Sequence, residues 1–173
     1  SQQPVPGPAP TIQVKEPQQY KLKNGLTVMF VENRKLPIVS ASLILDNPPI
    51  SEGIKAGLSS ITGSLLGKGS KKIKKDDFYD EIDFMGSNIS IGASSAFAQS
   101  LTRYFERTFQ MMADAAINPN FTEEEFSKER NILIDALKSS EKDVTTAARP
   151  VETLLAYGQG HPYAEYTTSG TVN

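Results

Sequence analysis

The 173-residue sequence contains no cysteine, no tryptophan and only one histidine. The absence of cysteine excludes disulfide bonds, a thiolate metal site and a cysteine nucleophile, and it is compatible with any cellular compartment. The single histidine, His161, cannot by itself make a three-ligand zinc site, although aspartate and glutamate could assist it. Chemistry that depends on thiols or on several imidazoles is therefore not expected.

An excess of charge of one sign and long apolar runs are also missing. Lys and Arg number 18 and Asp and Glu number 20, so the net charge is -2, which gives no reason to expect nucleic acid or an anionic membrane as a partner. No apolar run approaches the roughly 20 residues that span a bilayer, so we expect no membrane span. The first residues do not form a signal peptide, and an earlier cleavage stays open.

Prolines 4, 6, 8 and 10 lie in the first 18 residues, where they predict extended, polyproline-like backbone. We interpret residues 1–18 as a linker or tail, with a ligand for a proline-binding partner as the alternative. Residues 19–173 are expected to form a single domain, truncated at its C-terminal end. A proline- and glutamine-rich leader before a cysteine-free domain suits a bacterial periplasmic or secreted protein.

The first part of this domain has strand patterns. Asn24-Gly25 lies between alternating residues 20–23 and the apolar run 26–31, which predicts a hairpin with a type I′ turn. Residues 38–45 predict a third strand, and residues 87–101 predict a second hairpin. In the third strand, one face carries Val39, Ala41, Leu43 and Leu45.

A helix over residues 54–66 is predicted by apolar residues at i, i+4, i+7 and i+11, namely Ile54, Leu58, Ile61 and Leu65. Gly67 and Gly69 are expected to end it. The basic run that follows, residues 68–75, has five lysines but no phosphate-binding glycine pattern. We interpret it as a solvated loop.

Three more helices complete the pattern. Asp76 is the expected N-cap of a helix over residues 77–85. A second helix is expected to face the core with Phe105, Phe109, Met112 and Ala116. Thr122 and Glu125 form a capping box that opens the third. Together these segments predict an α+β fold, an antiparallel or mixed sheet with helices packed mainly on one face.

The segments also resemble the N-terminal domain of the insulinase-like (M16) zinc peptidases. Their metal helix has the pattern G-L-x-H-x-x-E-H-x-x-x-K-G-[ST], and Gly57-Leu58 and Lys68-Gly69-Ser70 keep its frame. The resemblance covers about residues 19–173, and its later motifs follow in family order: the helix Asp77 to Gly86, Asn118-Pro119, Phe121, Glu129-Arg130 and His161-Pro162-Tyr163. In the last of these, His161 is expected to be a structural, hydrogen-bonded residue.

In this frame the family's chemical positions carry small, uncharged side chains. Ser60 and Ser64 occupy the places of the two histidine ligands, Gly63 that of the glutamate general base and Ala136 that of the third ligand, a glutamate. Serine hydroxyls are poor neutral zinc ligands, and glycine and alanine offer none. The resemblance therefore implies no catalytic residue, no metal and no cofactor.

The resemblance then implies a non-catalytic subunit, a pseudopeptidase, that forms a chamber for unfolded peptide with an active zinc peptidase homologue. One alternative is a zinc metalloendopeptidase with a displaced metal site. A second is a stand-alone domain that binds peptides by strand addition at a sheet edge. Zinc titration separates the first two, and co-purification with a zinc-binding homologue separates the first from the third.

Overall fold

The computed structural model describes residue 7 and residues 16–172. Contacts between Cα atoms divide the chain into two units, Ser1–Pro37 and Ile38–Asn173, which are described separately. The tail predicted for residues 1–18 lies mostly outside the described residues. Its boundary, and that of the single domain over residues 19–173, stay predictions.

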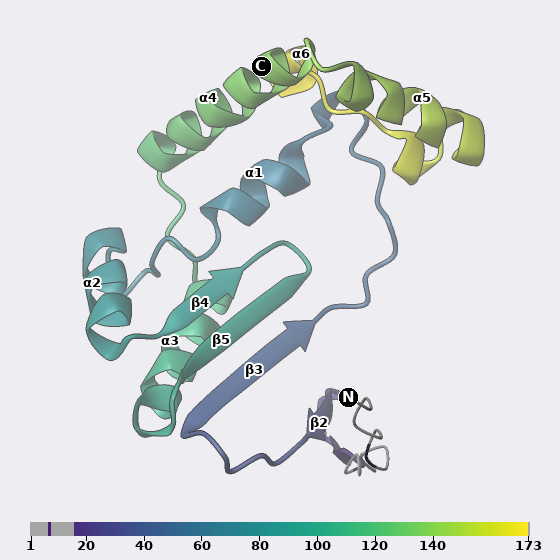
Figure 1. The fold of residues 1–173 in the computed structure, drawn as a ribbon. Coiled ribbons are helices and arrows are strands. Elements are labelled where there is room, and N and C mark those ends of the chain that lie inside the picture. Colours follow the sequence, from purple (N-terminus) through teal and green to yellow (C-terminus); the bar gives the residue numbers. More distant parts are fainter. Residues whose placement is uncertain (1–6, 8–15, 173) are drawn as a thin grey trace, which may run out of the picture. The chain divides into compact units, whose positions relative to one another are not determined.

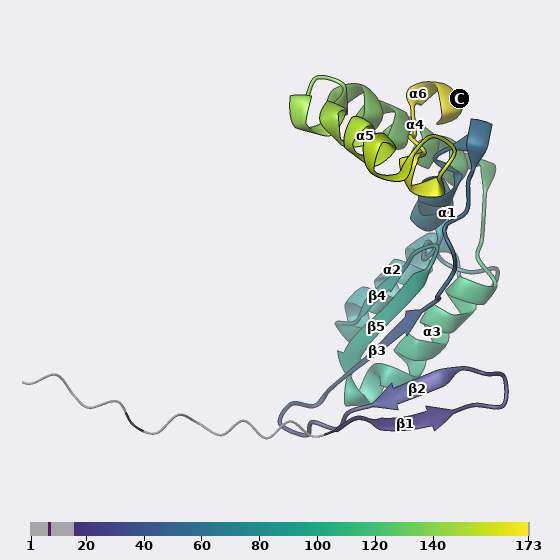
Figure 2. The same ribbon diagram turned by 90° about the vertical axis from the view of Figure 1, so that its right-hand side faces the viewer.

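The first unit contains an antiparallel hairpin of β1 (Gln18–Lys21) and β2 (Thr27–Phe30), in which Tyr20 pairs with Val28 (Figure 2). The hairpin is where the sequence predicts it, but the turn is not type I′. Such a turn needs positive φ at both central residues, and here Gly25 has a φ of 91° while Asn24 does not have positive φ. The Gly25 N–H donates to the Leu22 carbonyl at 3.0 Å, which is the pattern of a type I turn followed by a glycine bulge.

The second unit is built on a three-stranded antiparallel sheet with the order β3-β5-β4 (Figure 1). The strands are β3 (Ile38–Ile44), β4 (Asn88–Ile91) and β5 (Ser95–Leu101). Burial alternates along β3 with the predicted period of two. In the register, Ala98 of β5 lies opposite both Ala41 and Ile89. Within the described residues, β3 and β4 are the two edges of this sheet.

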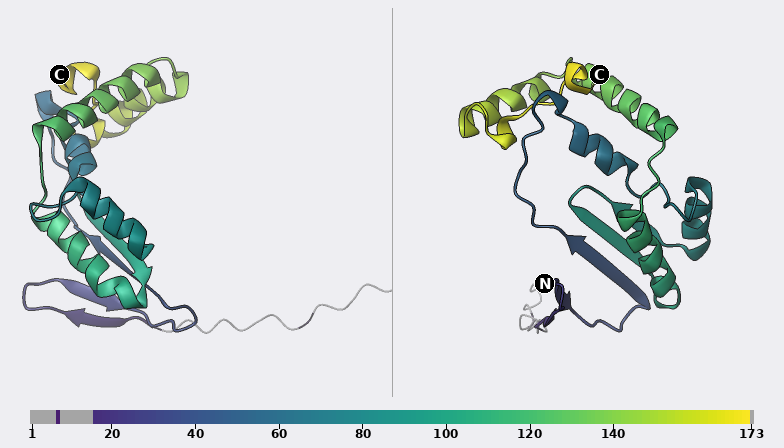
Figure 3. Two further views of the ribbon diagram at one scale, coloured as in Figure 1. Left: turned by 90° about the vertical axis from the view of Figure 1, so that its left-hand side faces the viewer. Right: turned by 180° about the vertical axis from the view of Figure 1, so that it is seen from behind.

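Two helices, α2 (Lys75–Met85) and α3 (Phe105–Ile117), lie side by side on one face of the sheet (Figure 3). The side chains between them and the sheet form the main core: Phe78, Ile82, Met85, Ile91, Ala96, Ala98, Met111, Met112 and Ala115. The predicted α+β class, with helices on one face of an antiparallel sheet, is confirmed.

Two details of these helices differ from the sequence prediction. Helix α2 begins at Lys75 after an extended Lys74, so Asp76 lies in its first turn and is not the N-cap. Helix α3 buries Thr108 and Met111, whereas Phe109 is 43% exposed. The prediction is confirmed at Met112, which is 4% exposed, and at Ala116, which packs against the core, and it was wrong at Phe109. A polar core position is possible because Thr108 Oγ1 lies 3.0 Å from the Tyr104 carbonyl, to which it donates.

The remaining helices are α1 (Leu58–Leu65), α4 (Glu123–Ser140), α5 (Val144–Tyr157) and α6 (Ser169–Val172), with 3-10 turns at Gly53–Lys55, Thr102–Tyr104 and Pro162–Ala164. Helices α1, α4 and α6 share a smaller core formed by Ile61, Leu65, Ile134 and Val172. The predicted cap of α4 is present, because the Glu125 N–H donates to Thr122 Oγ1 at 3.2 Å. No helix within the described residues is both long enough and apolar enough to cross a membrane.

Candidate functional site

Helix α1, which carries three of the four family positions, begins later than the sequence predicts. Gly57 has a φ of 109°, which interrupts the helix between a 3-10 turn at Gly53–Lys55 and its first residue, Leu58. As a result Ile54 is 88% exposed and Leu58 is 52% exposed, and only Ile61 and Leu65 face the core. The predicted helix over residues 54–66 was therefore wrong in its first turn. The spacing of apolar residues carries no information about the backbone angles of Gly57, so it could not indicate the interruption.

The free amides at the start of α1 are bound by Glu52. Its carboxylate accepts the N–H groups of Gly57 at 2.6 Å, Leu58 at 2.9 Å and Ser59 at 2.7 Å. Burial raises the pKa of Glu52, but the hydrogen bonds from Ser59, Gly57 and Leu58 outweigh it and hold the pKa below its ordinary value. A carboxylate in this place also interacts favourably with the positive, N-terminal end of the helix dipole.

Glu52 is in turn held by Glu165, which lies just after the 3-10 turn Pro162–Ala164. The Glu165 carboxylate accepts the Glu52 N–H at 2.6 Å, the Gly53 N–H at 2.5 Å and the Ser51 hydroxyl at 2.8 Å. The hydrogen bonds from Glu52 and Ser51 lower the pKa of Glu165. The sequence analysis did not identify either glutamate. Glu52 lies six residues before the first residue of α1, and Glu165 lies 113 residues from Glu52, so no local sequence pattern relates them to the helix.

The four family positions lie on two helices that pack together. Ser60 and Ser64 are exposed on α1, one turn apart, and Gly63 between them is half-buried. Ala136 is exposed on α4. The contact of Ile61 and Leu65 with Ile134 and neighbouring side chains joins the two helices. The ribbons of α1 and α4 run next to each other in Figure 1. The structure therefore brings together the two helices on which the resemblance places a metal site.

An ion-pair network between Lys68, just after α1, and the first half of α4 was not predicted from the sequence. Lys68 makes a hydrogen-bonded ion pair with Glu129, and its Nζ lies 3.6 Å from a Glu125 oxygen. Burial lowers the pKa of Lys68, but Glu129 and Glu125 more than offset this and raise it above its ordinary value. The interpretation of residues 68–75 as a solvated loop was wrong for Lys68, which is 18% exposed. The sequence feature that could have indicated this pairing is the spacing of Glu125 and Glu129, which lie four residues apart and so share one face of α4.

The chemistry of α1 at these positions is that of hydroxyls and backbone. A Cβ added at Gly63 would lie 3.6 Å from the backbone nitrogen of Ala93, in the loop between β4 and β5. In the part of the chain that the structure describes, no group of three or more His, Asp or Glu residues is placed to hold a metal ion. Ser60, Gly63, Ser64 and Ala136 thus do not provide the donor set of a zinc site.

His161 has a structural hydrogen bond, as expected. Its Nδ1 accepts the Tyr163 N–H at 3.1 Å, which caps the 3-10 turn Pro162–Ala164. Its ring stacks on Tyr157 at a centroid distance of 5.2 Å and lies 5.3 Å from the Tyr163 ring. This arrangement accounts for the histidine without a catalytic role.

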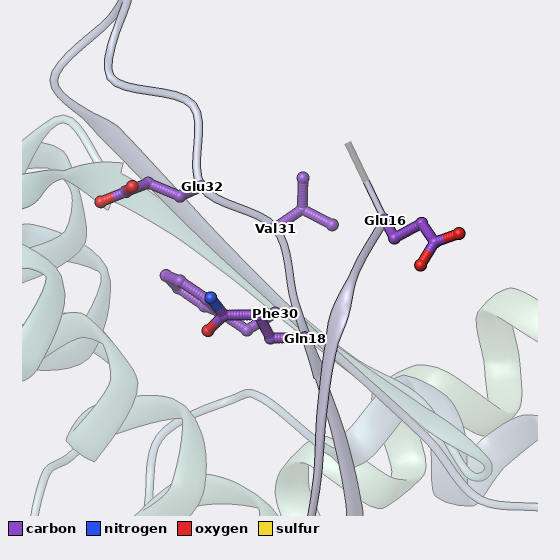
Figure 4. A pocket seen from close by; sticks show the side chains of 5 residues that line it. All are labelled: Glu16, Gln18, Phe30, Val31 and Glu32. Carbon is purple, nitrogen blue, oxygen red and sulfur yellow. The ribbon is translucent and has the colours of Figure 1, made fainter. Parts of the chain in front are cut away.

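Two surface hollows lie elsewhere. One, of about 100 Å³, belongs to the hairpin unit and is lined by Glu16, Gln18, Phe30, Val31 and Glu32 (Figure 4). The other, of about 390 Å³, is an open groove lined by Lys72, Ile73, Arg107, Gln110, Met111 and Asp114. Neither hollow includes any of the four family positions.

Two solved structures have a similar fold over most of this chain. A crystal structure of a peptidase M16 inactive domain from Pseudomonas fluorescens matches with a TM-score of 0.77 and 21% identity, over 90% of this chain and 39% of that one. The crystal structure of a protease from Helicobacter pylori matches with a TM-score of 0.73 and 18% identity, over 91% of this chain and 40% of that one. At these identities the likeness shows the fold, and this chain spans about two fifths of each solved chain.

The sequence gives the family. Residues 28–158 match the family model of insulinase, peptidase family M16. The chain therefore belongs to the insulinase family, M16. No curated protein matches it significantly in sequence. The assignment of Ser60, Gly63, Ser64 and Ala136 to the family's chemical positions stays a prediction from the motif frame.

Proposed function

We propose that this chain is part of a non-catalytic M16 subunit that forms a peptide-binding chamber with an active zinc peptidase homologue. The proposal is supported by the motif frame, which puts Ser60, Gly63, Ser64 and Ala136 at the four family positions, and by the observed packing of α1 on α4. A chamber wall needs the packing of α1 on α4 but not the metal. The similar structure from Pseudomonas fluorescens is described as an inactive domain, which is consistent with this role.

A partner also needs a surface, and α5 offers one. Its residues at i, i+4, i+7 and i+11 are Val144, Ala148, Val151 and Leu155, and all four are exposed. Val144 is 84% exposed and Leu155 is 81% exposed. Apolar stripes of this kind on a helix usually mark an interface. We propose that this stripe, named the α5 stripe below, contacts the homologous partner.

The two alternatives have less support. A displaced zinc site would need several ligands, and His161, the single histidine, already uses Nδ1 as an acceptor for Tyr163. Peptide binding by strand addition has one favourable observation, the edge strands β3 and β4, which present unpaired backbone groups within the described residues. That property also suits a chamber wall, so it does not favour the stand-alone domain.

The proposal extends to the domain organisation, the assembly and the location of the protein. We propose that residues 19–173 are the N-terminal M16-like domain of a longer subunit, that residues 1–18 are a tail, and that the protein works as a heterodimer in a bacterial periplasm or outside the cell. Retrieval of the native complex by a tag on the full-length protein, followed by fractionation, tests the length of the subunit, the heterodimer and the location, and limited proteolysis tests whether residues 1–18 are a tail.

The decisive experiment compares four samples: the full-length protein, an active homologue retrieved with it, their mixture, and a variant with Ser60→His, Gly63→Glu, Ser64→His and Ala136→Glu. Peptidase activity on an unfolded peptide and zinc content by elemental analysis are measured for each. We expect no activity and no stoichiometric zinc for the wild-type chain, and higher activity of the homologue in the mixture. The variant should gain zinc, because two imidazoles one turn apart and a carboxylate are restored.

Chelator-sensitive hydrolysis by the wild-type protein alone would favour the displaced metal site. Peptide binding without any homologous partner would favour the stand-alone domain. A variant with only Ala136→Glu is the matched control, because one carboxylate without the imidazoles should not bind zinc tightly.

A further inference from the structure

We infer that the segment from Glu165 to Val172 is a strap that fixes the start of α1, and that Glu165 acts on α1 through Glu52. The inference goes beyond the proposed function and does not depend on it. It concerns a conformational coupling between two segments more than 100 residues apart in sequence.

The first attachment of the strap involves two carboxylates, of which Glu165 holds the backbone of Glu52 and Glu52 holds the start of α1. Glu165 binds the backbone of Glu52 and Gly53 and the hydroxyl of Ser51, and none of its hydrogen bonds reaches α1. Glu52 then binds the first amides of α1. The backbone of Glu52 is therefore positioned by one carboxylate, and its side chain positions the helix.

The second attachment lies at the other end of the same loop. Thr171 Oγ1 donates to the carbonyl of Ala56 at 2.7 Å, and Ala56 is buried. Gly57 packs so closely on the strap that an added Cβ would lie 2.8 Å from Thr167 Cγ2 and 3.0 Å from Val172 Cγ2. The loop from Ser51 to Gly57 is thus held at both ends by residues of the strap.

Such a strap matters because α1 is short. It has eight residues, and Gly57 at its N-cap has no side chain that could accept a hydrogen bond. Without Glu52 the first amides would have to be satisfied by water. A displacement of the strap should consequently move or fray the turn that precedes Ser60. The strap is therefore a route by which contacts at the C-terminal segment reach the helix that carries the family positions.

The test is amide hydrogen exchange, residue by residue, in the described chain. Glu165→Gln keeps one acceptor oxygen where two are needed, and we expect it to lower the protection of the Leu58 and Ser59 amides at least about fivefold, although Glu165 does not touch them. Protection of Ala98 in β5 should stay unchanged. The matched control is Glu152→Gln on α5, an exposed glutamate, which should change neither.

A double-variant comparison completes the test. In a Glu52→Gln background, Glu165→Gln should add little further loss at Leu58 and Ser59, because the route is already interrupted. The inference would be overturned if Glu165→Gln lowered the protection of Leu58 and Ser59 by the same factor in the Glu52→Gln background as in the wild type. It would also be overturned if Glu165→Gln alone left the protection of these two amides unchanged. If Glu165→Gln also lowers the protection of Ala98, Thr171→Val decides: loss confined to the start of α1 supports the strap, and uniform or no loss overturns it.

Discussion

Lys75 Nζ lies 3.0 and 2.9 Å from the two carboxylate oxygens of Glu125, and this ion pair joins the first residue of α2 to the first turn of α4. Glu125 is the second member of the predicted capping box. Its N–H bonds to Thr122 as expected, but its side chain turns to Lys75, and the described hydrogen bonds include none from the Thr122 N–H to it. The cap is therefore one-sided, because a lysine from another element competes for the carboxylate.

Lys68 offers the clearest stability prediction in this network. Lys68→Met should lower the free energy of unfolding by about 1–2 kcal/mol, because it leaves the carboxylates of Glu129 and Glu125, 14% and 15% exposed, without this partner. Chemical denaturation measures the change. The matched control is Lys72→Met, because Lys72 is 78% exposed and its Nζ is 3.7 Å from Asp114, so its effect should stay within about 0.5 kcal/mol. Equal effects of the two variants would contradict the role of the network.

The cap of α1 predicts a pH dependence. The pKa of Glu52 is lowered in the folded chain from its ordinary value of 4.5, so the unfolded chain binds more protons between the two values. The stability contributed by this cap should be fully present above the unfolded-state pKa and lost as the pH falls through the folded-state pKa. The pKa of Glu165 is also lowered in the folded chain, so its contribution to stability should change with pH in the same direction.

Glu52→Gln isolates this contribution. At pH 7 the variant should be less stable by about 1 kcal/mol, the usual loss for a helix cap. The difference between wild type and variant should shrink as the pH is lowered below about 4.5, as followed by denaturation at a series of pH values. A difference that stays constant down to pH 3 would show that the carboxylate charge is not what stabilises α1.

Gly63 and Gly57 should respond in opposite directions to the same substitution. Gly63→Ala should raise the free energy of unfolding by about 0.5–1 kcal/mol, because the residue is within α1 and the new Cβ would have an ordinary 3.6 Å contact. Gly57→Ala should lower it by about 1–3 kcal/mol, because φ is 109° and the added Cβ would lie 2.8 Å from Thr167 Cγ2. Thermal unfolding of both variants is the measurement, and a lower melting temperature for Gly63→Ala would contradict the geometry of α1.

The α5 stripe should matter for partner binding and not for folding. Leu155→Glu should change the free energy of unfolding of the isolated chain by less than about 0.5 kcal/mol, since Leu155 is 81% exposed. Its affinity for the homologous partner should fall at least about tenfold. Ile117→Glu, at a residue that is 77% exposed on α3, is the control and should leave the affinity unchanged. Similar losses for both variants would place the interface elsewhere.

Several elements could be predicted from neighbouring residues alone. The alternation along β3, the buried positions Phe78, Ile82 and Met85 on α2, and the Thr122 cap depend on contacts that a period of two, a period of 3.6 or a capping pattern encodes. The α+β class was predicted from the order of strands and helices along the chain, and the family resemblance from the order and spacing of short motifs.

The start of α1 could not be predicted in this way. Ile54 and Leu58 fit the helical spacing as well as Ile61 and Leu65 do, so the pattern gave no reason to separate them. The separation comes from Gly57, whose φ is 109° and beside which Thr167 and Val172 leave no room for a Cβ. The exposure of Phe109 on α3 could not be predicted for the same reason, because Phe109 fits the helical spacing as well as Met112 does and only packing against the sheet separates them.

The sequence by itself determined the family, the fold class and the identity of the four small side chains, because these depend on residue types and their order along the chain. Only the tertiary structure decided where α1 begins, why Lys68 is half-buried and which carboxylate caps α1. Those features depend on Glu165, Thr171 and Glu129, which lie 61 to 115 residues from their partners. Hydrogen bonds and ion pairs act over a few ångströms in space, so folding alone brings such residues within reach of one another.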